Sequence, residues 1–380
     1  MSSEQSAILE ALFDQSIEEA VKKVRTMQDV DLIIGIPFYN EKEVLPEVLA
    51  LVQKGLQEIE PLRAALLLCV GDPAGAEVLE AVNQADLKVP FCGFLMKPGT
   101  NGRGSSIRAI IEIANLLTAD LVILAADLKH EGLRGFQPDW IRRLLAPVRE
   151  EHDLAVGNFE RHHFEDVIGG LFAAPLLETY YGYRFQDPLS GVYAMSHDLV
   201  ENYAIEIKFW TDITQGYGID PWLLTRAIVW NKKICEVKLG AKLAVASLEK
   251  INYVFKETAA SLFTCIKKDE DYWTGRLTSI ARTPDVCGCE YRDTPYPTFF
   301  ALRDLVLAFK RSFNHYDVLY QKALPQEIYK VLEGIVHTPT RDFNHTDPVC
   351  SFNANIWAQL VNRFLIHYWF DNGVQRDDVL

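Results

Sequence analysis

The 380-residue sequence has no long apolar run, no excess of positive charge and no evenly paired set of cysteines. No apolar stretch reaches the roughly 18 residues that a membrane-spanning helix requires. The first residues lack the basic segment followed by an apolar core that marks a secretory signal. We therefore expect a cytoplasmic protein without a membrane span.

The charge balance disfavours a polyanionic partner. The chain has 52 acidic residues against 38 lysines and arginines, which gives a formal net charge of -14 at pH 7. Binding to a nucleic-acid backbone or an anionic lipid surface requires a positive field that releases counterions. No nucleic acid is therefore expected as a partner, and a small-molecule ligand is favoured.

The cysteine pattern predicts free thiols. Seven cysteines are present, an odd number, and only Cys287 and Cys289 are close in sequence. The others are scattered, mostly on apolar segments, which predicts reduced thiols in a cytoplasm. The close pair is compatible with half of a zinc site, but no second pair follows at zinc spacing. We favour an ordinary loop at this position.

Apolar runs and helical patterns alternate along most of the chain. Predicted strands span 31–36, 64–70, 89–96, 120–126, 153–159, 191–195 and 234–239. Predicted helices span 6–27, 42–58, 75–84, 104–117, 138–150, 167–181, 197–204, 220–230, 259–266, 299–313 and 356–370. The alternation predicts an α/β fold with a mostly parallel sheet and helices on both faces. We expect three parts: an N-terminal helix (1–30), the α/β domain (31–254) and a helical C-terminal region (255–380).

One apolar run ends in a way that indicates a ligand. Residues Ile33 to Ile36 stop at Pro37 and open onto Asn40 and Glu41 before a helical pattern begins. A strand buried on both faces of a parallel sheet consists of continuous aliphatics, and the loop at its carboxyl end is where open α/β sheets hold ligands. We expect a nucleotide at this loop.

Three further polar segments follow predicted strands and should lie at the same edge of the sheet: Gly71 to Pro73, Lys97 to Gly104 and Asp127 to His130. The second segment ends at a helix N-terminus behind glycines. The N–H groups and the positive dipole end there, with Lys97 and Arg103, suit a diphosphate. The segment lacks the Walker pattern and the third glycine of a dinucleotide fingerprint, so an ordinary glycine-rich connection is the alternative.

Asp127 directly follows the apolar run Leu121 to Ala126. A carboxylate at the end of a buried strand is unfavourable unless it meets a cation or hydrogen-bond donors. Carboxylate and phosphate oxygens are the ligands that Mg²⁺ and Mn²⁺ prefer, so one interpretation is a metal ion that bridges two phosphates. The alternative is a helix cap or turn residue.

Two turns rich in glycine and aromatic residues lie further along the chain, at 185–194 and 216–222. The first leads into a predicted strand and the second into a predicted helix. Asp220 is placed to cap that helix, which by itself explains the residue. Two such turns in succession are more typical of the lining of a polar small-molecule site.

Together these landmarks resemble the retaining GT-A glycosyltransferases, in particular the glucosyl-3-phosphoglycerate synthase and mannosylglycerate synthase group. The similarity runs from about residue 31 to residue 242, and it depends on the order and spacing of several segments. Those segments are Ile36-Pro37-Phe38-Tyr39-Asn40-Glu41, Gly102-Arg103-Gly104, Ala125-Ala126-Asp127, Pro188-Leu189-Ser190-Gly191-Val192-Tyr193-Ala194, Gly216-Tyr217-Gly218-Ile219-Asp220 and Leu239-Gly240-Ala241-Lys242.

The resemblance, together with the charged residues near these segments, implies roles for all of them except Leu239 to Lys242. The implied donor site comprises Pro37, Phe38, Tyr39, Asn40, Glu41, Asp72, Lys97, Gly102, Arg103, Ala126 and Asp127. The implied acceptor site comprises Arg161, His163, Ser190, Gly191, Tyr217, Gly218 and Asp220. Catalysis would rest on Asp220, Lys97 and Arg103. Asp127 would bind Mg²⁺ or Mn²⁺ as the last residue of the family's Asp-X-Asp motif.

Three departures from the family pattern weaken the metal and acceptor expectations. Ala125 stands where the first carboxylate of Asp-X-Asp is expected, and no histidine lies between residues 197 and 315 to serve as the family's metal ligand. The segment Val167-Ile168-Gly169 aligns with the family's acceptor-phosphate segment, but its side chains cannot bind a phosphate. Arg161 and His163 are therefore expected to bind a different acceptor.

We expect a hexosyltransferase that moves a sugar from a nucleoside diphosphate sugar to a small polar, glycerate-like acceptor with retention of configuration, and we expect a homodimer. A non-catalytic nucleotide-sugar-binding protein is the alternative, which Ala125 and the missing histidine favour. A sugar nucleotidyltransferase is less favoured, because its glycine-rich phosphate loop usually follows the first strand, where this chain has Asn40 and Glu41.

Overall fold

The computed structural model describes residues 3–27, 29–60, 62, 64–162, 164–207, 212–243, 248–276, 280–288, 301–338, 352–370 and 376–380. The chain forms two compact units, Met1–Pro297 and Thr298–Leu380. The candidate site residues predicted from the sequence all belong to the first unit. The three-part division of the chain at 30/31 and 254/255 stays a prediction.

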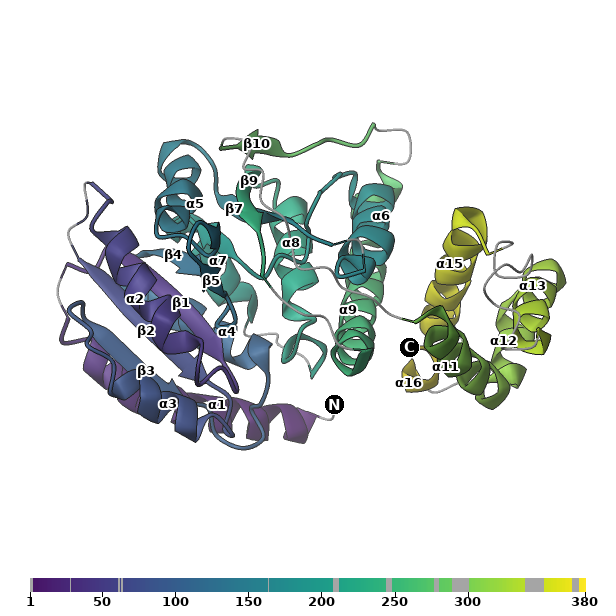
Figure 1. The fold of residues 1–380 in the computed structure, drawn as a ribbon, viewed down its shortest axis with the longest axis horizontal. Helices are drawn as coiled ribbons and strands as arrows, with labels where there is room; N and C mark the ends of the chain where they lie inside the picture. Colours follow the sequence, from purple (N-terminus) through teal and green to yellow (C-terminus); the bar gives the residue numbers. More distant parts are fainter. Residues whose placement is uncertain are drawn as a thin grey trace. The chain divides into compact units, whose positions relative to one another are not determined.

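The described part of the first unit contains an eight-stranded sheet with the spatial order β10-β9-β7-β8-β4-β1-β2-β3 (Figure 1). Its strands are β1 (Leu32–Phe38), β2 (Ala65–Gly71), β3 (Phe91–Leu95), β4 (Asp120–Ile123), β7 (Leu154–Glu160), β8 (Tyr193–Met195), β9 (Ile234–Ala241) and β10 (Asp285–Cys287). Only β8 runs antiparallel to its neighbours β4 and β7; the other described pairings in this sheet are parallel. The predicted mostly parallel α/β sheet is confirmed.

The central strands are aliphatic because helices cover both faces of the sheet. All residues of β1 and β2 are buried. On one face, Leu32 and Ile34 belong to the core that contains Leu49 of α2 and Trp140 of α5. On the other face, a Cβ added to Gly35 would lie 2.4 Å from the Ile110 side chain of α4, so this helix packs directly on the β1 backbone.

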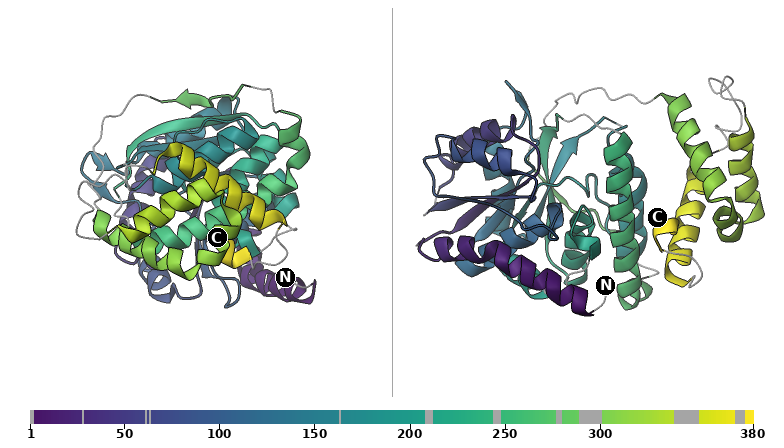
Figure 2. Two further views of the ribbon diagram at one scale, coloured as in Figure 1. Left: turned by 90° about the vertical axis from the view of Figure 1, so that its right-hand side faces the viewer. Right: turned by 90° about the horizontal axis from the view of Figure 1, so that it is seen from below.

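The helices of the first unit are α1 (Ser3–Val24), α2 (Leu45–Leu56), α3 (Ala76–Asn83), α4 (Arg103–Leu117), α5 (Asp139–Glu150), α7 (His197–Glu206), α8 (Ile219–Val229), α9 (Leu248–Lys268) and α10 (Glu270–Thr274). Helices α2, α3 and α5 share one side of the sheet, and α1, α4 and α7 share the other. Helix α1 runs along its side as a long purple helix (Figure 2, right). The helices predicted in this unit are confirmed except for 167–181, and α9 begins earlier than the predicted helix 259–266.

Two sequence predictions differ from the structure near the candidate site. The predicted strand 120–126 ends at Ile123, because Leu124 donates its last sheet hydrogen bond to Gly35. The following Ala125 and Ala126 are buried but leave the sheet to line a pocket. The predicted helix 167–181 is three joined segments, with π-helices η1 (Gly169–Ala173) and η2 (Leu177–Tyr181) on either side of α6 (Ala174–Leu176).

Several short elements lack a periodic signal and were not predicted. They are the hairpin β5 (His130–Glu131) with β6 (Arg134–Gly135), the edge strand β10, the short helix α10 and the 3-10 turn η4 (Asp212–Thr214). Strand β10 contains Cys287, and the thiols of Cys69, Cys92, Cys235, Cys265 and Cys287 are free in the structure. Cys289 and Cys350 lie outside the described residues, so the redox state of the full set stays a prediction.

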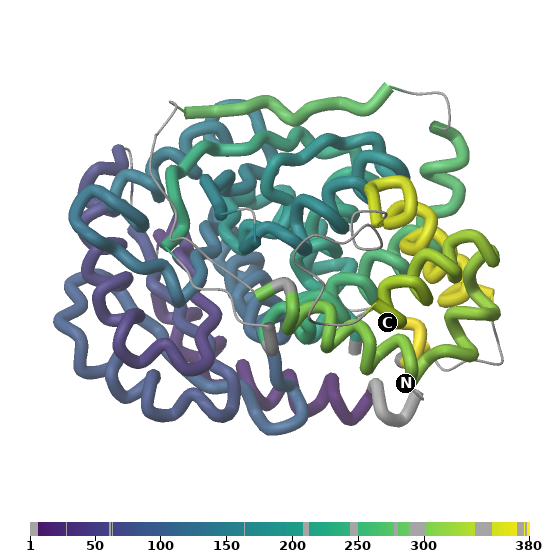
Figure 3. Tube along the Cα trace, turned by 45° about the vertical axis from the view of Figure 1, so that its right-hand side comes forward, coloured from purple at the N-terminus to yellow at the C-terminus, as the bar shows by residue number. Residues whose placement is uncertain are grey.

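The C-terminal unit is helical, as predicted. Its described helices are α11 (Leu302–His315), α12 (Asp317–Ala323), α13 (Gln326–His337), α15 (Ala354–Phe370) and α16 (Arg376–Val379), coloured from green to yellow in Figure 3. Aromatic rings join the first four: Phe313 stacks on Tyr320 at 4.8 Å and contacts Tyr329 of α13 at 5.5 Å, and Tyr320 meets Phe364 edge-on at 5.5 Å. No described helix of the chain is long and apolar enough to cross a membrane.

Candidate active site

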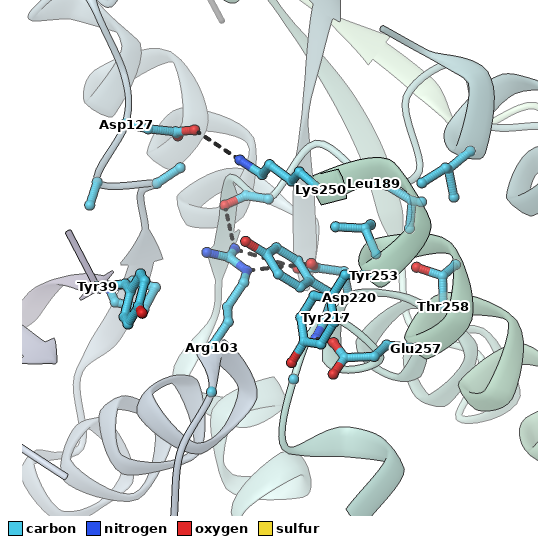
Figure 4. A pocket seen from close by; sticks show the side chains of 18 of the residues that line it. Tyr39, Arg103, Asp127, Leu189, Tyr217, Asp220, Lys250, Tyr253, Glu257 and Thr258 are labelled. Atoms are coloured by element: carbon cyan, nitrogen blue, oxygen red, sulfur yellow. Dashed lines mark hydrogen bonds and ion pairs between the residues drawn. The ribbon is translucent and has the colours of Figure 1, made fainter. Parts of the chain in front are cut away.

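A pocket of about 900 Å³ opens at the carboxyl ends of β1, β2, β4 and β9. It lies within the first unit, and its walls also include the starts of α4 and α8 and one face of α9 (Figure 4). Eight acidic and four cationic side chains line it. Because phosphate binding requires cations or N–H donors, the partners of those four cations decide where a diphosphate fits.

The loop after β1 forms one wall of the pocket. Pro37, Phe38, Tyr39, Asn40 and Glu41 all line it, as predicted residues of the donor site. The Glu41 carboxylate accepts hydrogen bonds from the backbone N–H groups of Tyr39 at 2.7 Å and Asn40 at 3.1 Å, which fixes the loop. The Tyr39 side chain is left 54% exposed, so its ring offers a flat apolar face to a ligand.

Asp72 joins the end of β2 to the start of α4. One carboxylate oxygen accepts from the Gly102 N–H at 3.0 Å, and the other accepts from the Ala74 N–H at 3.1 Å. Gly102 has a φ of +101°, which favours glycine, and an added Cβ would lie 2.6 Å from the Gln215 carbonyl oxygen. In this structure the Asp72 carboxylate therefore bonds to the backbone and fixes the turn into α4.

The N-terminus of α4 packs against the segment 214–216. A Cβ at Gly104 would lie 1.9 Å from the Thr214 carbonyl oxygen, and the Ser105 N–H donates to the Gln215 carbonyl at 3.0 Å. The N–H groups of Gly102 and Ser105 are thus already bonded within the protein. These bonds reduce the number of donors that the helix start offers to a phosphate.

Lys97 was predicted to bind the donor sugar nucleotide and to act in catalysis, but the structure does not place it in the pocket. Its ammonium donates to the Gln15 side chain of α1 at 3.1 Å, and its backbone N–H donates to the Ser16 hydroxyl at 3.0 Å. Lys97 is exposed and is absent from the pocket lining. In the structure its contacts attach the glycine-rich loop to α1.

Arg103 and Asp220 both line the pocket and form a buried pair, whose interaction Figure 4 marks with dashed lines. The Arg103 guanidinium donates to the Asp220 carboxylate at 3.4 and 3.5 Å and to the Gly191 carbonyl at 2.9 Å. The buried Tyr193 hydroxyl donates to the same carboxylate at 3.0 Å. Burial opposes the charge of Arg103, but the Asp220 carboxylate and the nearby Tyr193 and Tyr217 together outweigh it, so the Arg103 pKa is raised.

The predicted capping role of Asp220 is wrong. The cap position of α8 is Gly218, and Asp220 lies one residue inside the helix, with its carboxylate turned to Arg103 and Tyr193. The pair holds Asp220 in one orientation, with 5% of the residue exposed. A carboxylate with two fixed donors is suited to orienting a ligand hydroxyl, since it still has lone pairs to share.

Asp127 lies at the end of the segment after β4, between two lysines. The Lys242 ammonium, just after β9, is 3.7 Å from one carboxylate oxygen, and the Lys250 ammonium of α9 is 3.6 Å from the other (Figure 4 shows the second pair). Lys242 is the main cause that holds the Asp127 pKa well below its usual range. Burial lowers the Lys242 pKa, whereas the Asp127 carboxylate opposes that shift.

The predicted metal ion does not fit this set of side chains. Ala125 supplies no ligand, and Asp127 already has two ammonium groups beside it. Among the described residues no group of three histidine, cysteine or acidic side chains is arranged to hold a metal ion. A divalent cation at Asp127 would face two positive charges with one carboxylate to offset them.

On the predicted acceptor side of the pocket, carboxylates surround the Arg161 guanidinium. Its guanidinium donates to Asp187 at 2.9 Å and to Glu165 at 3.3 Å. Asp166 follows, and its carboxylate packs closely on Gly169 and Gly170, because an added Cβ there would lie 2.4 and 2.5 Å from its two oxygens. Burial and the neighbouring Asp187 raise the Asp166 pKa to about 6.

The remaining predicted acceptor residues divide into two groups. Ser190, Gly191 and Tyr217 line the pocket. Gly218 does not line it; its carbonyl accepts from the Ser261 hydroxyl at 2.6 Å, and a Cβ there would lie 2.2 Å from the Ile213 carbonyl. His163 lies outside the described residues.

Helix α9 supplies site residues that the sequence prediction missed: Lys250, Tyr253, Glu257 and Thr258. Glu257 accepts from the Tyr217 N–H at 2.6 Å, and the rings of Tyr217 and Tyr253 meet edge-on at 6.0 Å. Lys250, Tyr253 and Glu257 are three and four residues apart, which is the spacing of one helix face. That spacing was the signal available in the sequence. Lys242 was quoted for the resemblance without a role.

Comparisons with known proteins agree in part with the predicted resemblance. No protein-family model matches the sequence, and no curated protein matches it either. Among solved structures, the chain is similar to glucosyl-3-phosphoglycerate synthase from Mycobacterium tuberculosis in complex with Mn²⁺, uridine diphosphate and phosphoglyceric acid, at 18% identity and a TM-score of 0.47. That match covers 65% of this chain and 81% of the other.

Two further structures of the same mycobacterial synthase give comparable values. A complex with Mg²⁺ and uridine diphosphate matches at 16% identity, over 66% of this chain and 83% of the other, with a TM-score of 0.47. A complex with Mn²⁺, UDP-glucose and glycerol 3-phosphate matches at 18% identity over the same shares, with a TM-score of 0.46. This is a partial likeness in fold, so the function proposed below rests on the site of this chain.

Proposed function

We propose that the protein is a hexosyltransferase that takes its sugar from a nucleoside diphosphate sugar and retains the anomeric configuration. One observation carries the proposal: a single cavity contains a polar, tyrosine-rimmed loop, a pair of lysines at a strand end and the buried Arg103–Asp220 pair. These suit, in turn, a nucleobase with its ribose, a diphosphate and a hexose.

The side chains support transfer on one face of the sugar without a protein nucleophile. Asp220 is held by Arg103 and Tyr193, which suits it to orient a sugar or acceptor hydroxyl rather than to attack. The bond from the anomeric carbon to the diphosphate oxygen breaks, with its electron pair on the oxygen. The acceptor hydroxyl oxygen then bonds to the anomeric carbon from the same face, and its proton passes to the departing phosphate oxygen. The cations of the pocket stabilise that developing charge.

We propose that the acceptor is a small hydroxyl compound, glycerate-like in size, that carries no phosphate. Arg161 is already bonded to Asp187 and Glu165, and Asp166 adds a further carboxylate beside them. A phosphate group there would meet this excess of negative charge, and like charges in a partly dry site repel strongly. A neutral polyol or a compound with one carboxylate meets less repulsion.

Turnover with UDP-, GDP- and ADP-hexoses, each combined with glycerol, glycerate and 3-phosphoglycerate, tests the function. We expect transfer to an unphosphorylated acceptor, with the anomeric configuration of the donor kept in the product as read by NMR. Asp220→Asn should lose most of the turnover, while Asp198→Asn, an exposed acidic residue in the first turn of α7, serves as its control. An inverted product would refute the one-face route.

A second candidate function is nucleotide-sugar binding without catalysis. Ala125 and the two lysines beside Asp127 favour it, because they depart from the family's metal centre. Tight binding of a donor sugar by calorimetry, with no transfer and no hydrolysis for any acceptor tested, would establish this alternative and contradict the hexosyltransferase.

A further inference from the structure

Four cations line the pocket, and two of them are committed to the protein. Arg103 is bonded to Asp220 and to the Gly191 carbonyl, and Arg161 is bonded to Asp187 and Glu165. The other two, Lys242 and Lys250, both pair with Asp127. Two ammonium groups thus meet at one carboxylate, which leaves a net positive charge at this point of the pocket for a diphosphate.

We propose that Lys242 and Lys250 bind the donor diphosphate directly, in the place that a divalent cation would take, so that this protein binds its nucleotide without a metal ion. The proposal rests on the proposed function, because it concerns the diphosphate of the same donor. It follows from the geometry at Asp127: two ammonium groups converge on one carboxylate from separate elements, the end of β9 and the first turn of α9.

The charges at this point match those of a metal centre. Two ammonium groups and one carboxylate have the same net charge as a divalent cation held by one carboxylate. The Lys242 ammonium also carries three N–H donors, more than one carboxylate at 3.7 Å uses. A diphosphate oxygen can therefore bind the lysine ammonium groups while Asp127 keeps its place beside them.

The two lysines differ in solvent exposure, and both environments suit diphosphate binding. The Lys242 side chain is 12% exposed and lies 6.0 Å over the Phe159 ring, which fixes its position. The Lys250 side chain is 53% exposed, so it can follow a ligand that enters from solvent. Partial burial of the pair also strengthens its attraction for phosphate, since less water screens it.

Calorimetric titration with UDP and with GDP, in EDTA and then in Mn²⁺, tests the proposal without depending on turnover. We expect the dissociation constant of the binding nucleotide to differ by less than about threefold between the two conditions. Lys250→Met should weaken binding by roughly 10- to 100-fold, the effect of losing a charge-assisted contact, and Lys250→Arg should restore most of it. Lys54→Met, at an exposed position of α2 away from the pocket, is the matched control.

Asp127→Asn separates the lysine site from a metal site, and circular dichroism checks that the variant is folded. The variant should bind the nucleotide in EDTA at least as tightly as the unmodified protein, because it removes a negative charge beside the phosphates. Binding that requires Mn²⁺ and disappears in Asp127→Asn would overturn the lysine proposal and leave the hexosyltransferase standing. If neither nucleotide binds under either condition, both proposals are overturned.

Discussion

Asp220→Asn is the substitution that examines the site most directly. It removes the charge that Arg103 faces, while an amide of nearly the same size keeps one acceptor for the Tyr193 hydroxyl. The Arg103 side chain is 13% exposed and the Asp220 side chain 8%, so the guanidinium is left buried without its charged partner and keeps its hydrogen bond to the Gly191 carbonyl.

The size of the effect follows from that burial. Removing one partner of a buried ion pair destabilises a protein by about 3–5 kcal/mol, and the bond to Gly191 that remains reduces this to roughly 2–4 kcal/mol. Losing a helix cap would destabilise by only about 1 kcal/mol. The free energy of unfolding in urea, followed by circular dichroism, distinguishes the two magnitudes.

Turnover of the same variant supplies the second measurement. We expect a large fall in kcat with nucleotide binding nearly unchanged, because in the proposed function Asp220 orients the reacting sugar whereas the two lysines bind the diphosphate. Asp198→Asn should change stability by no more than about 0.5 kcal/mol and leave turnover unaltered, as an exposed residue near a helix start. If Asp220→Asn behaves like Asp198→Asn in both assays, the buried pair has neither the energy nor the role assigned to it.

Three further predictions concern other parts of the site. The folded-state pKa of Asp166 is raised to about 6, so its stabilising contribution is present below about pH 4 and is lost as the pH rises through 6. Asp166→Asn should therefore raise the melting temperature at pH 7.5 more than at pH 4.5. After allowing for partial exposure, the difference should be equivalent to about 1–2 kcal/mol. An equal shift at both pH values would contradict this. Gly104→Ala should destabilise the protein by roughly 1–3 kcal/mol and weaken nucleotide binding, because the added Cβ would clash with the Thr214 carbonyl. Its control is Gly334→Ala in α13, where the added Cβ has open space around it. That variant should stabilise the protein by about 0.5–1 kcal/mol in the same urea titration. Transfer to glycerol or glycerate should exceed transfer to 3-phosphoglycerate in competition, and a preference for the phosphorylated acceptor would show that Arg161 is not neutralised by its carboxylates.

The architecture of the first unit could be predicted from the sequence because it depends on local patterns. A strand such as β1 is buried on both faces, so its residues are aliphatic whatever they contact, and the periodicity of α2 and α4 follows from one buried stripe each. The chain order of these elements then places the loops after β1, β2 and β4 at one edge of the sheet. Tyr39, Asp72 and Asp127 were found in this way, without knowledge of their contacts.

The partners of those residues depended on the tertiary structure. Asp220 has the pattern of a cap, and only the approach of α4 to α8 shows that it faces Arg103. Lys97 precedes a glycine-rich loop and Lys250 lies in the first turn of a helix, so the sequence gives no reason to treat them differently. In the structure Lys97 bonds to Gln15 of α1, whereas Lys250 pairs with Asp127. An ion pair between residues that are far apart in sequence leaves no periodic signal, because its geometry is set by the packing of separate elements. The sequence alone therefore determined where the pocket lies, and the packing of β9 and α9 decided which charges meet inside it.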